Sequence, residues 1–403
     1  MTLKGEHQPL VKRHRHSLAQ FVLGAASRVF PPLQSWRHRK ADHYGRSALD
    51  LYLKGEVNAA ILSYTKALNW SPEDAYLHSA LGQVYYEQEK YANAIKEFRK
   101  ALEHDYYNHR ALKGLALSLH ITGDQLDAIY VYLRALDVVP DDLDVLVNVG
   151  TLLYERRRYD EAIEYYAKAE KLDPKNAATY LNLGMAYHSM GKFEDALTNL
   201  RNASKLDPQN SETCRLIGLC LESSGNYVGA LESYQEAVQH DEKNAEATLD
   251  IAQVLNELRR PAEAIPYGLK AANEFLEVND QEGVANAYWE VGWSHYLLGA
   301  WNASIKASQE ALRLSPNLFP ARFNLGLALL QTNRLPEARH EYEEAINAVS
   351  TPSDIGTYAI EDLKAAMTHN PELPGAEGIL DFLTTEYGRK VGWLISHGSP
   401  SAR

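Results

Sequence analysis

The side chains that could carry chemistry in this chain are two cysteines, 15 histidines and many carboxylates. Cys214 and Cys220 are six residues apart, so on one helix they point in different directions and cannot share a zinc ion. The densest histidine cluster, His14 and His16, lies in a basic run with no cysteine or carboxylate beside it. We therefore predict that both thiols are structural, that the chain has no metal site and that it needs no cofactor.

Acidic pairs are the other candidates for catalysis, but Glu161 and Glu164 fall on a segment expected to face solvent. The sequence contains no glycine-rich phosphate loop, no His-Glu-x-x-His pattern and no Gly-x-Ser-x-Gly element. We predict that the chain is not an enzyme.

The composition is that of a folded protein, with 45% hydrophobic and 23% charged residues in 403. Asp and Glu number 53 against 41 Lys and Arg, a net charge of −12, so we expect no nucleic-acid partner, which would require a basic surface. Two cysteines are too few for a disulfide framework.

The first segment, residues 1–40, differs from the rest because it is basic and includes a short apolar run, Leu18 to Phe30. That run is too short and too often interrupted to span a membrane. Three interpretations stay open: a targeting signal, an anchor to an anionic lipid surface, or an inert tail. We expect a cytoplasmic protein, with a membrane-associated, exported or organellar location as the alternative.

A 34-residue repeat organises most of the remaining chain. One alanine recurs in register at Ala67, Ala101, Ala135, Ala169, Ala203, Ala237, Ala271, Ala311 and Ala345. Another small residue precedes each of them by seven positions, and a third precedes that one by twelve. This register predicts nine units, seven in residues 41–278 and two in residues 285–352, separated by an insertion at 279–284.

The three small residues per unit predict a pair of amphipathic helices that approach closely. Bulky side chains at these positions would push the two helices apart. Gly191-Lys192 and Gly225-Asn226 are typical of the turns between them, and prolines such as Pro174 mark the passage to the next unit.

The repeat resembles the tetratricopeptide repeat family, which has a 34-residue pattern. The resemblance rests on Leu-Gly-x-x-Tyr at Leu81 to Tyr85, on Ala-x-x-x-Phe-x-x-Ala at Ala94 to Ala101, and on the Asp-Pro pairs ending at Pro174 and Pro208. It implies an all-α fold, a right-handed solenoid of about nine helix-turn-helix units. Residues 353–403 would supply capping helices and a tail.

In this family the first helix of every unit lines a groove that binds peptides, and the sixth residue of the unit faces it. Asn148, Asn182 and Asn324 occupy that sixth position here. An asparagine amide can pair with the N–H and C=O groups of any bound main chain, as in the similar asparagine ladder of the O-linked N-acetylglucosamine transferases. The alternative is that these amides bond to neighbouring helices.

The same pattern places Trp289, Trp293 and Tyr296 in the eighth unit, and Phe323 in the ninth, on groove-facing positions. Aromatic anchors are the usual energetic centre of an interface, so these residues are candidate partner-binding residues. The alternative is that the C-terminal helices of residues 353–390 fold back and cover them.

Taken together, these patterns predict a non-catalytic scaffold or adaptor that binds peptide segments or partner proteins in its groove. The alternative is a regulatory or substrate-recruiting subunit of an enzyme complex whose catalytic chain is separate. A protein or peptide partner is expected in either case. A membrane surface contacted through residues 1–40 and self-association into a homo-oligomer stay open.

Overall fold

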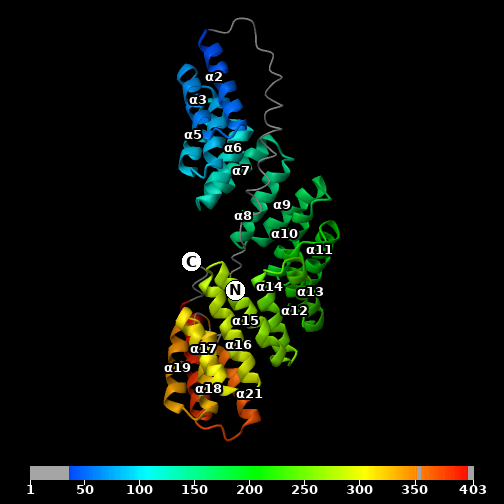
Figure 1. Cartoon of the computed structure of the whole chain (residues 1–403), viewed down its shortest axis with the longest axis vertical. Coiled ribbons are helices and arrows are strands. Elements are labelled where there is room, and N and C mark those ends of the chain that lie inside the picture. The colour runs from blue at the N-terminus through cyan, green and yellow to red at the C-terminus, as the bar shows by residue number, and fades with distance from the viewer. Residues whose placement is uncertain (1–35, 350, 352–354, 398–403) are drawn as a thin grey trace. The chain divides into compact units, whose positions relative to one another are not determined.

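The computed structural model describes residues 36–349, 351 and 355–397, and the chain divides into two compact units, Met1–Leu152 and Leu153–Arg403. Every regular element of the described residues is a helix, as Figure 1 shows. No helix in this part of the chain is both long and apolar enough to cross a membrane. The basic run of residues 1–35 lies outside the described residues, so its three interpretations stay predictions.

Along the sequence, eighteen of the described helices follow one another as nine consecutive pairs. In chain order the pairs are α2 (Trp36–Leu53) with α3 (Val57–Trp70), α4 (Ala75–Glu87) with α5 (Tyr91–His104), α6 (His109–Ile121) with α7 (Gln125–Val138), α8 (Leu143–Glu155) with α9 (Tyr159–Leu172), α10 (Ala177–Ser189) with α11 (Phe193–Leu206), α12 (Ser211–Ser223) with α13 (Tyr227–His240), α14 (Ala245–Glu257) with α15 (Pro261–Glu277), α16 (Gln281–Leu297) with α17 (Trp301–Leu314), and α18 (Phe319–Gln331) with α19 (Leu335–Ala348).

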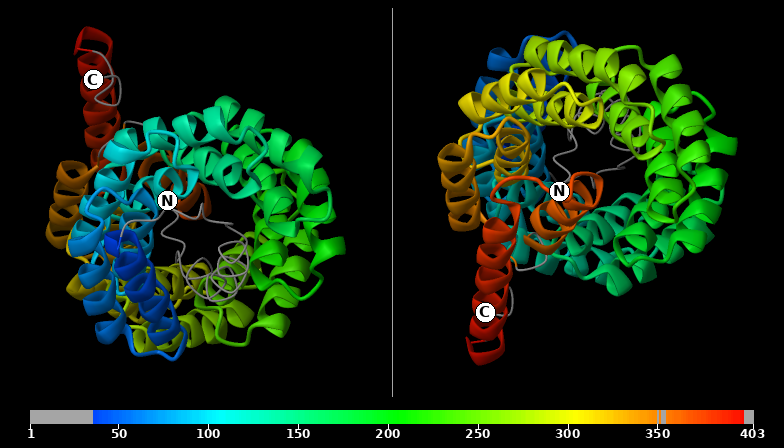
Figure 2. Two further views of the ribbon diagram at one scale, coloured as in Figure 1. Left: turned by 90° about the horizontal axis from the view of Figure 1, so that it is seen from above. Right: turned by 90° about the horizontal axis from the view of Figure 1, so that it is seen from below.

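From α9 to α19, each helix packs against the next one along the chain, and Figure 2 shows these helices following one another from green to orange. The first helices of neighbouring pairs also contact each other directly, as α14 does with α16 and α16 with α18. The first unit repeats this contact between α4 and α6. The prediction of an all-α solenoid built from helix pairs is confirmed.

The small residues of the repeat lie where helices come closest. A methyl group on Gly114 of α6 would lie 2.2 Å from the ring of Phe98, and one on Gly82 of α4 would lie 2.8 Å from the same ring. Phe98, on α5, is itself completely buried. Because Gly82 and Gly114 have no side chain, the Phe98 ring of α5 can pack closely against both α4 and α6.

The turn inside each pair contains one residue with positive φ. Five of the nine are glycines, and Glu89, Arg157, Arg259 and Asn333 occupy the same repeat position in the other pairs. The following residue closes the turn, as when the N–H of Lys192 donates to the carbonyl of Tyr187 at 2.9 Å. This left-handed residue after the first helix is a common helix stop, and it costs least when it is glycine.

Of the six residues 279–284 expected as an insertion, Asn279 and Asp280 lie in the turn before α16, and Gln281 to Val284 form its first turn. α15 and α16 have 17 residues each, whereas the corresponding helices of the preceding pair, α13 and α12, have 14 and 13. Phe275 near the end of α15 and Val284 near the start of α16 are buried in one cluster. The added turns therefore extend the packed junction between the seventh and eighth pairs.

Three further helical segments follow the ninth pair, namely η1 (Gly356–Glu361), α21 (Asp362–His369) and α22 (Ala376–His397). Ile355, Ala359 and Leu363 are buried in one cluster with residues of α18 and α19. In Figure 2, α22 (red) extends past the other helices of its unit. These segments cover apolar surface of the last pair, as the end of a stacked array requires.

Candidate partner-binding face

Polar side chains connect the first helices of neighbouring pairs at repeated positions. Three of these hydrogen bonds join the twelfth residue of one repeat to the thirteenth of the next, namely Tyr154 Oη to Ser189 Oγ at 3.0 Å, His188 Nε2 to Ser223 Oγ at 3.3 Å, and Gln331 Nε2 to Tyr296 Oη at 3.2 Å. They recur because equivalent residues of stacked helices lie side by side. Burial lowers the pKa of His188, which favours its neutral form.

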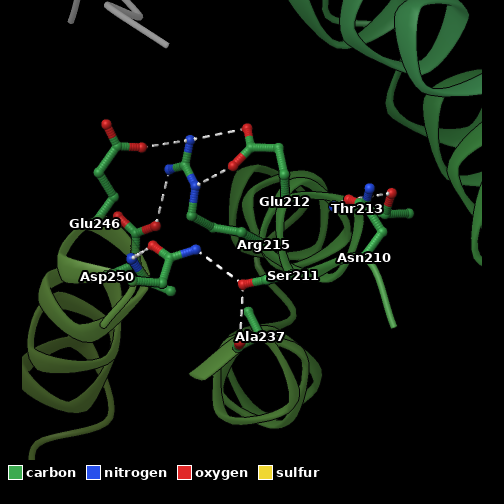
Figure 3. A network of polar contacts seen from close by, with 10 residues as sticks. Asn210, Ser211, Glu212, Thr213, Arg215, Ala237, Glu246 and Asp250 are labelled. Carbon is green, nitrogen blue, oxygen red and sulfur yellow. Dashed lines mark hydrogen bonds and ion pairs between the residues drawn. The ribbon is translucent and has the colours of Figure 1, made fainter. Parts of the chain in front are cut away.

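A buried ionic contact on this face centres on Arg215 of α12 (Figure 3). Its Nη1 donates to Asp250 at 3.1 Å and its Nε to Glu212 at 3.1 Å, while Nη2 lies 2.9 Å from Glu246. Arg215 and Asp250 are 5% and 7% exposed, so the pair is shielded from water. Burial raises the pKa of the Asp250 carboxyl, and the Arg215 guanidinium acts in the opposite direction.

A second buried contact joins α14 to α16. The amide of Asn256 donates to Glu290 Oε1 at 2.6 Å and to Ser294 Oγ at 2.8 Å. All three side chains are buried. Burial raises the pKa of Glu290 to about 7, because the hydrogen bond from Asn256 only partly compensates for the lost hydration.

The first unit has a corresponding contact between α6 and the start of α8. Lys113 Nζ lies 2.9 Å from Asp142 and 3.1 Å from Asp144, and His109 Nε2 lies 2.7 Å from Asp142. Asp142 also accepts the N–H of Val145 at 3.1 Å, which caps α8. Burial opposes ionisation of Asp142, but the bonds from His109 and Lys113 outweigh it and hold its pKa well below the usual range.

Two of the three predicted asparagines keep their amides available. Asn148 on α8 and Asn182 on α10 are half-buried, and neither side chain has a hydrogen-bond partner among the described residues. The residues at the same repeat position in the seventh and eighth pairs are Asp250 and Glu290. Both already accept hydrogen bonds, Asp250 from Arg215 and Glu290 from Asn256. Asn148 belongs to the first unit and Asn182 to the second.

The predicted residues of the ninth pair are not at the surface. Asn324 is 5% exposed and Phe323 is 1% exposed. The Phe323 ring packs against Phe319 and Tyr342, in the cluster that includes residues of η1 and α21. Because these side chains are shielded, a bound peptide would not reach them in this structure.

The aromatic residues of the eighth pair are partly covered. Trp289, Trp293 and Tyr296 are half-buried, and the Trp293 and Tyr296 rings stack with their centroids 5.3 Å apart. Both rings pack against the cluster that contains Phe323. Trp293 and Tyr296 therefore border the covered end of the array, and all three aromatic residues keep part of their surface exposed.

Models of one repeat family match more than half of the chain. The model described as "TPR repeat" matches residues 48–89 and 150–191, and models described as "Tetratricopeptide repeat" match residues 79–142, 318–354, 177–210 and 221–266. The chain belongs to the tetratricopeptide repeat family. Two of the matched ranges contain Asn182, which lies on the first helix of a matched repeat.

Individual tetratricopeptide repeat proteins are similar to parts of the chain. A solved tetratricopeptide repeat protein from Parabacteroides merdae is 16% identical, covering 62% of this chain and 99% of its own, with a TM-score of 0.51. This likeness shows the fold alone. YrrB, described as a TPR protein with an unusual peptide-binding site, is 21% identical and covers 46% of this chain and 95% of its own, with a TM-score of 0.42.

A curated relative, the BBSome complex member BBS4 from Bos taurus, is 28% identical over 111 residues. The match covers 28% of this chain and 21% of that protein, so the chain spans about a fifth of the relative's length.

Sequence reasoning missed the contact around Arg215, although the tetratricopeptide repeat register contained a signal for it. Arg215 is the fifth residue of its repeat and Asp250 the sixth of the next, so an arginine and an aspartate one repeat apart lie on facing helix surfaces. Both thiols are buried, and burial raises the pKa of Cys214 to about 11 and of Cys220 to about 12.

Proposed function

We propose that this protein is a scaffold that binds an extended segment of a partner protein along the first helices of its repeats. The observation that carries the proposal is the pair of half-buried, unpartnered amides of Asn148 and Asn182 at a position that is engaged or buried in later repeats. A half-buried amide without a partner is well placed to bond a peptide main chain, because it loses little hydration on binding.

The surroundings of Asn182 suit an extended peptide. Leu181 and Met185 are half-buried beside it on α10 and pack onto the core below. An apolar side chain of the partner can contact these two residues while its main chain pairs with the Asn182 amide. A flexible methionine adapts to side chains of different shape, which favours a contact of broad specificity.

Asn148 has a similar setting in the first unit. Val147 and Thr151 flank it on α8 and are half-buried. The Thr151 hydroxyl donates to the carbonyl of Val147 at 3.0 Å, so it is already engaged within its own helix. The amide of Asn148 is therefore the polar group of this surface that a ligand could engage.

The test is partner capture by the whole chain with and without these amides. Crosslinking and mass spectrometry would identify the partner protein and the segment of it that is bound. That segment would be synthesised as a fluorescently labelled peptide, and its affinity for the chain would be measured by fluorescence anisotropy. We expect Asn182→Ala to weaken binding roughly 3- to 10-fold, the net value of one or two hydrogen bonds. Asn148→Ala, measured separately, should weaken a peptide that contacts the first unit by a similar factor.

The matched control is Asn202→Ala. Asn202 is also half-buried and belongs to the same helix pair, but it lies on the second helix, α11. It should leave the affinity unchanged. If Asn182→Ala keeps full affinity, or loses no more affinity than Asn202→Ala, the surface formed by the first helices of the pairs is not the binding surface.

A further inference from the structure

Three potential metal ligands lie close together in the sixth helix pair, between its two helices α12 and α13. They are the thiol of Cys214 on α12 and the Glu236 and His240 side chains on α13, and their ligand atoms all lie within 4.8 Å of one another. We predicted no metal site from the sequence because Cys214 and Cys220 cannot share an ion, whereas Glu236 and His240 lie 22 and 26 positions after Cys214. Folding one hairpin brings them together.

The helix geometry holds this arrangement. Glu236 and His240 are four residues apart on α13, so both project from one face, and His240 Nε2 lies 3.7 Å from Glu236 Oε1. One turn before Cys214, Ser211 Oγ donates to the carbonyl of Ala237 at 2.8 Å, which ties the start of α12 to the end of α13 (Figure 3). Cys214 itself packs against Ala237 and Ala247.

The site has one buried and two accessible donors. Cys214 is 2% exposed, whereas the side chains of His240 and Glu236 are 23% and 57% exposed. An ion can therefore enter from the side of α13. Donors of a tetrahedral zinc site lie about 3.6 Å apart, given metal–ligand distances of about 2.0–2.3 Å. The exposed Glu236 and His240 side chains can supply this small adjustment by changing rotamer.

We propose that Cys214, Glu236 and His240 bind a divalent metal ion of the zinc class. One sulfur, one imidazole nitrogen and one carboxylate oxygen are a donor set that zinc accepts, and they leave one position for water or another ligand. On binding, the Cys214 thiol releases its proton to solvent and a thiolate–metal bond forms. The thiolate and carboxylate then balance the two charges of the ion, and the ion joins α12 to α13.

The test uses Co²⁺ as an optical probe for zinc in the full-length reduced chain. A thiolate bound to Co²⁺ gives a charge-transfer band in the near ultraviolet that histidine and carboxylate ligands do not give. We expect this band to saturate at one Co²⁺ per chain and to disappear when Zn²⁺ is added. Cobalt bound only by His14 and His16 would not produce it.

Variants assign the ligands. Cys214→Ala should abolish the band, and His240→Ala and Glu236→Ala should each weaken Co²⁺ binding at least about 10-fold. Cys220→Ala is the matched control, because Cys220 is also a buried thiol on α12 but is absent from the cluster. It should leave the band unchanged. Circular dichroism would verify that each variant is folded.

Two results would overturn the site. One is a full-length chain that shows no thiolate–cobalt band under reducing conditions. The other is a folded Cys214→Ala chain that retains the band. Neither result bears on the proposed peptide-binding face, because that face is tested through Asn148 and Asn182.

Discussion

The Arg215 guanidinium donates a 3.1 Å hydrogen bond to the Asp250 carboxylate, 35 residues further along the chain. This contact joins α12 to α14, and Glu212 and Glu246 at its edge are about half exposed. Removing the buried cation is costly because Asp250, which is 7% exposed, would keep its charge in a region of low hydration.

Replacing Arg215 by methionine should destabilise the second unit strongly. The substitution keeps much of the side-chain volume but leaves Asp250 buried without its cation, at a cost of roughly 3 kcal/mol. Urea unfolding at pH 8, followed by circular dichroism, would measure the loss. Arg313→Met is the control: Arg313 pairs with Glu310 on the surface, and its removal should change the midpoint little. Equal effects of the two variants would contradict a structural role for Arg215.

Glu290→Gln should stabilise the chain in mildly basic solution. The folded-state pKa of Glu290 is raised from 4.5 to about 7, so the folded chain binds its proton more tightly than the unfolded chain. Its contribution to stability therefore falls as the pH rises from about 4.5 through 7. Glutamine keeps an oxygen acceptor for Asn256 and carries no charge.

The expected gain of Glu290→Gln at pH 8 is on the order of 1 to 3 kcal/mol, and it should vanish below pH 4.5. Thermal unfolding of both chains at pH 4.5 and pH 8 would measure it. A variant that is equally or less stable than the natural chain at pH 8 would show that Glu290 is not held in a poorly hydrated site.

Gly218→Ala should destabilise the sixth pair. The added methyl group would lie 2.5 Å from the ring of Tyr234, which is completely buried and cannot easily move. We expect a loss of about 1 to 3 kcal/mol in urea unfolding. Gly388→Ala on α22 is the control, because it meets no atom within 4 Å and should stabilise its helix slightly. Similar effects of both substitutions would rule out close packing at Gly218.

Phe323→Ala should behave as a core substitution rather than as the loss of a surface contact. The ring is 1% exposed and lies against Tyr342, so its removal should cost about 3 to 5 kcal/mol. Trp289→Ala provides the comparison, since Trp289 is half-buried and should cost less. Differential scanning calorimetry would rank the two. A small effect of Phe323→Ala would restore this residue as a surface candidate.

The sequence predicts the helix pairs well because their packing depends on residue size at fixed spacing. Ala101 and Ala135 are both fully buried, as their register requires. The exposure of the candidate residues could not be predicted in the same way. Phe323 is buried in a cluster with Ile355 and Leu363, which belong to segments outside the repeat.

Side-chain contacts between different helices also could not be predicted from the sequence. The cluster of Cys214, Glu236 and His240 depends on the angle at which α12 and α13 meet, and that angle has no period in the chain. Asn148 and Asn182 could be selected from the register alone. Their freedom from partners becomes visible only when the side chains of adjacent helices are placed.

The lengthened helices α15 and α16 have a mechanical consequence. Bending the array where they meet would expose Phe275 and Val284 to water, and each buried apolar side chain of this size resists exposure by about 1.5 to 3 kcal/mol. A force that bends the array at this point must therefore first separate the end of α15 from the start of α16.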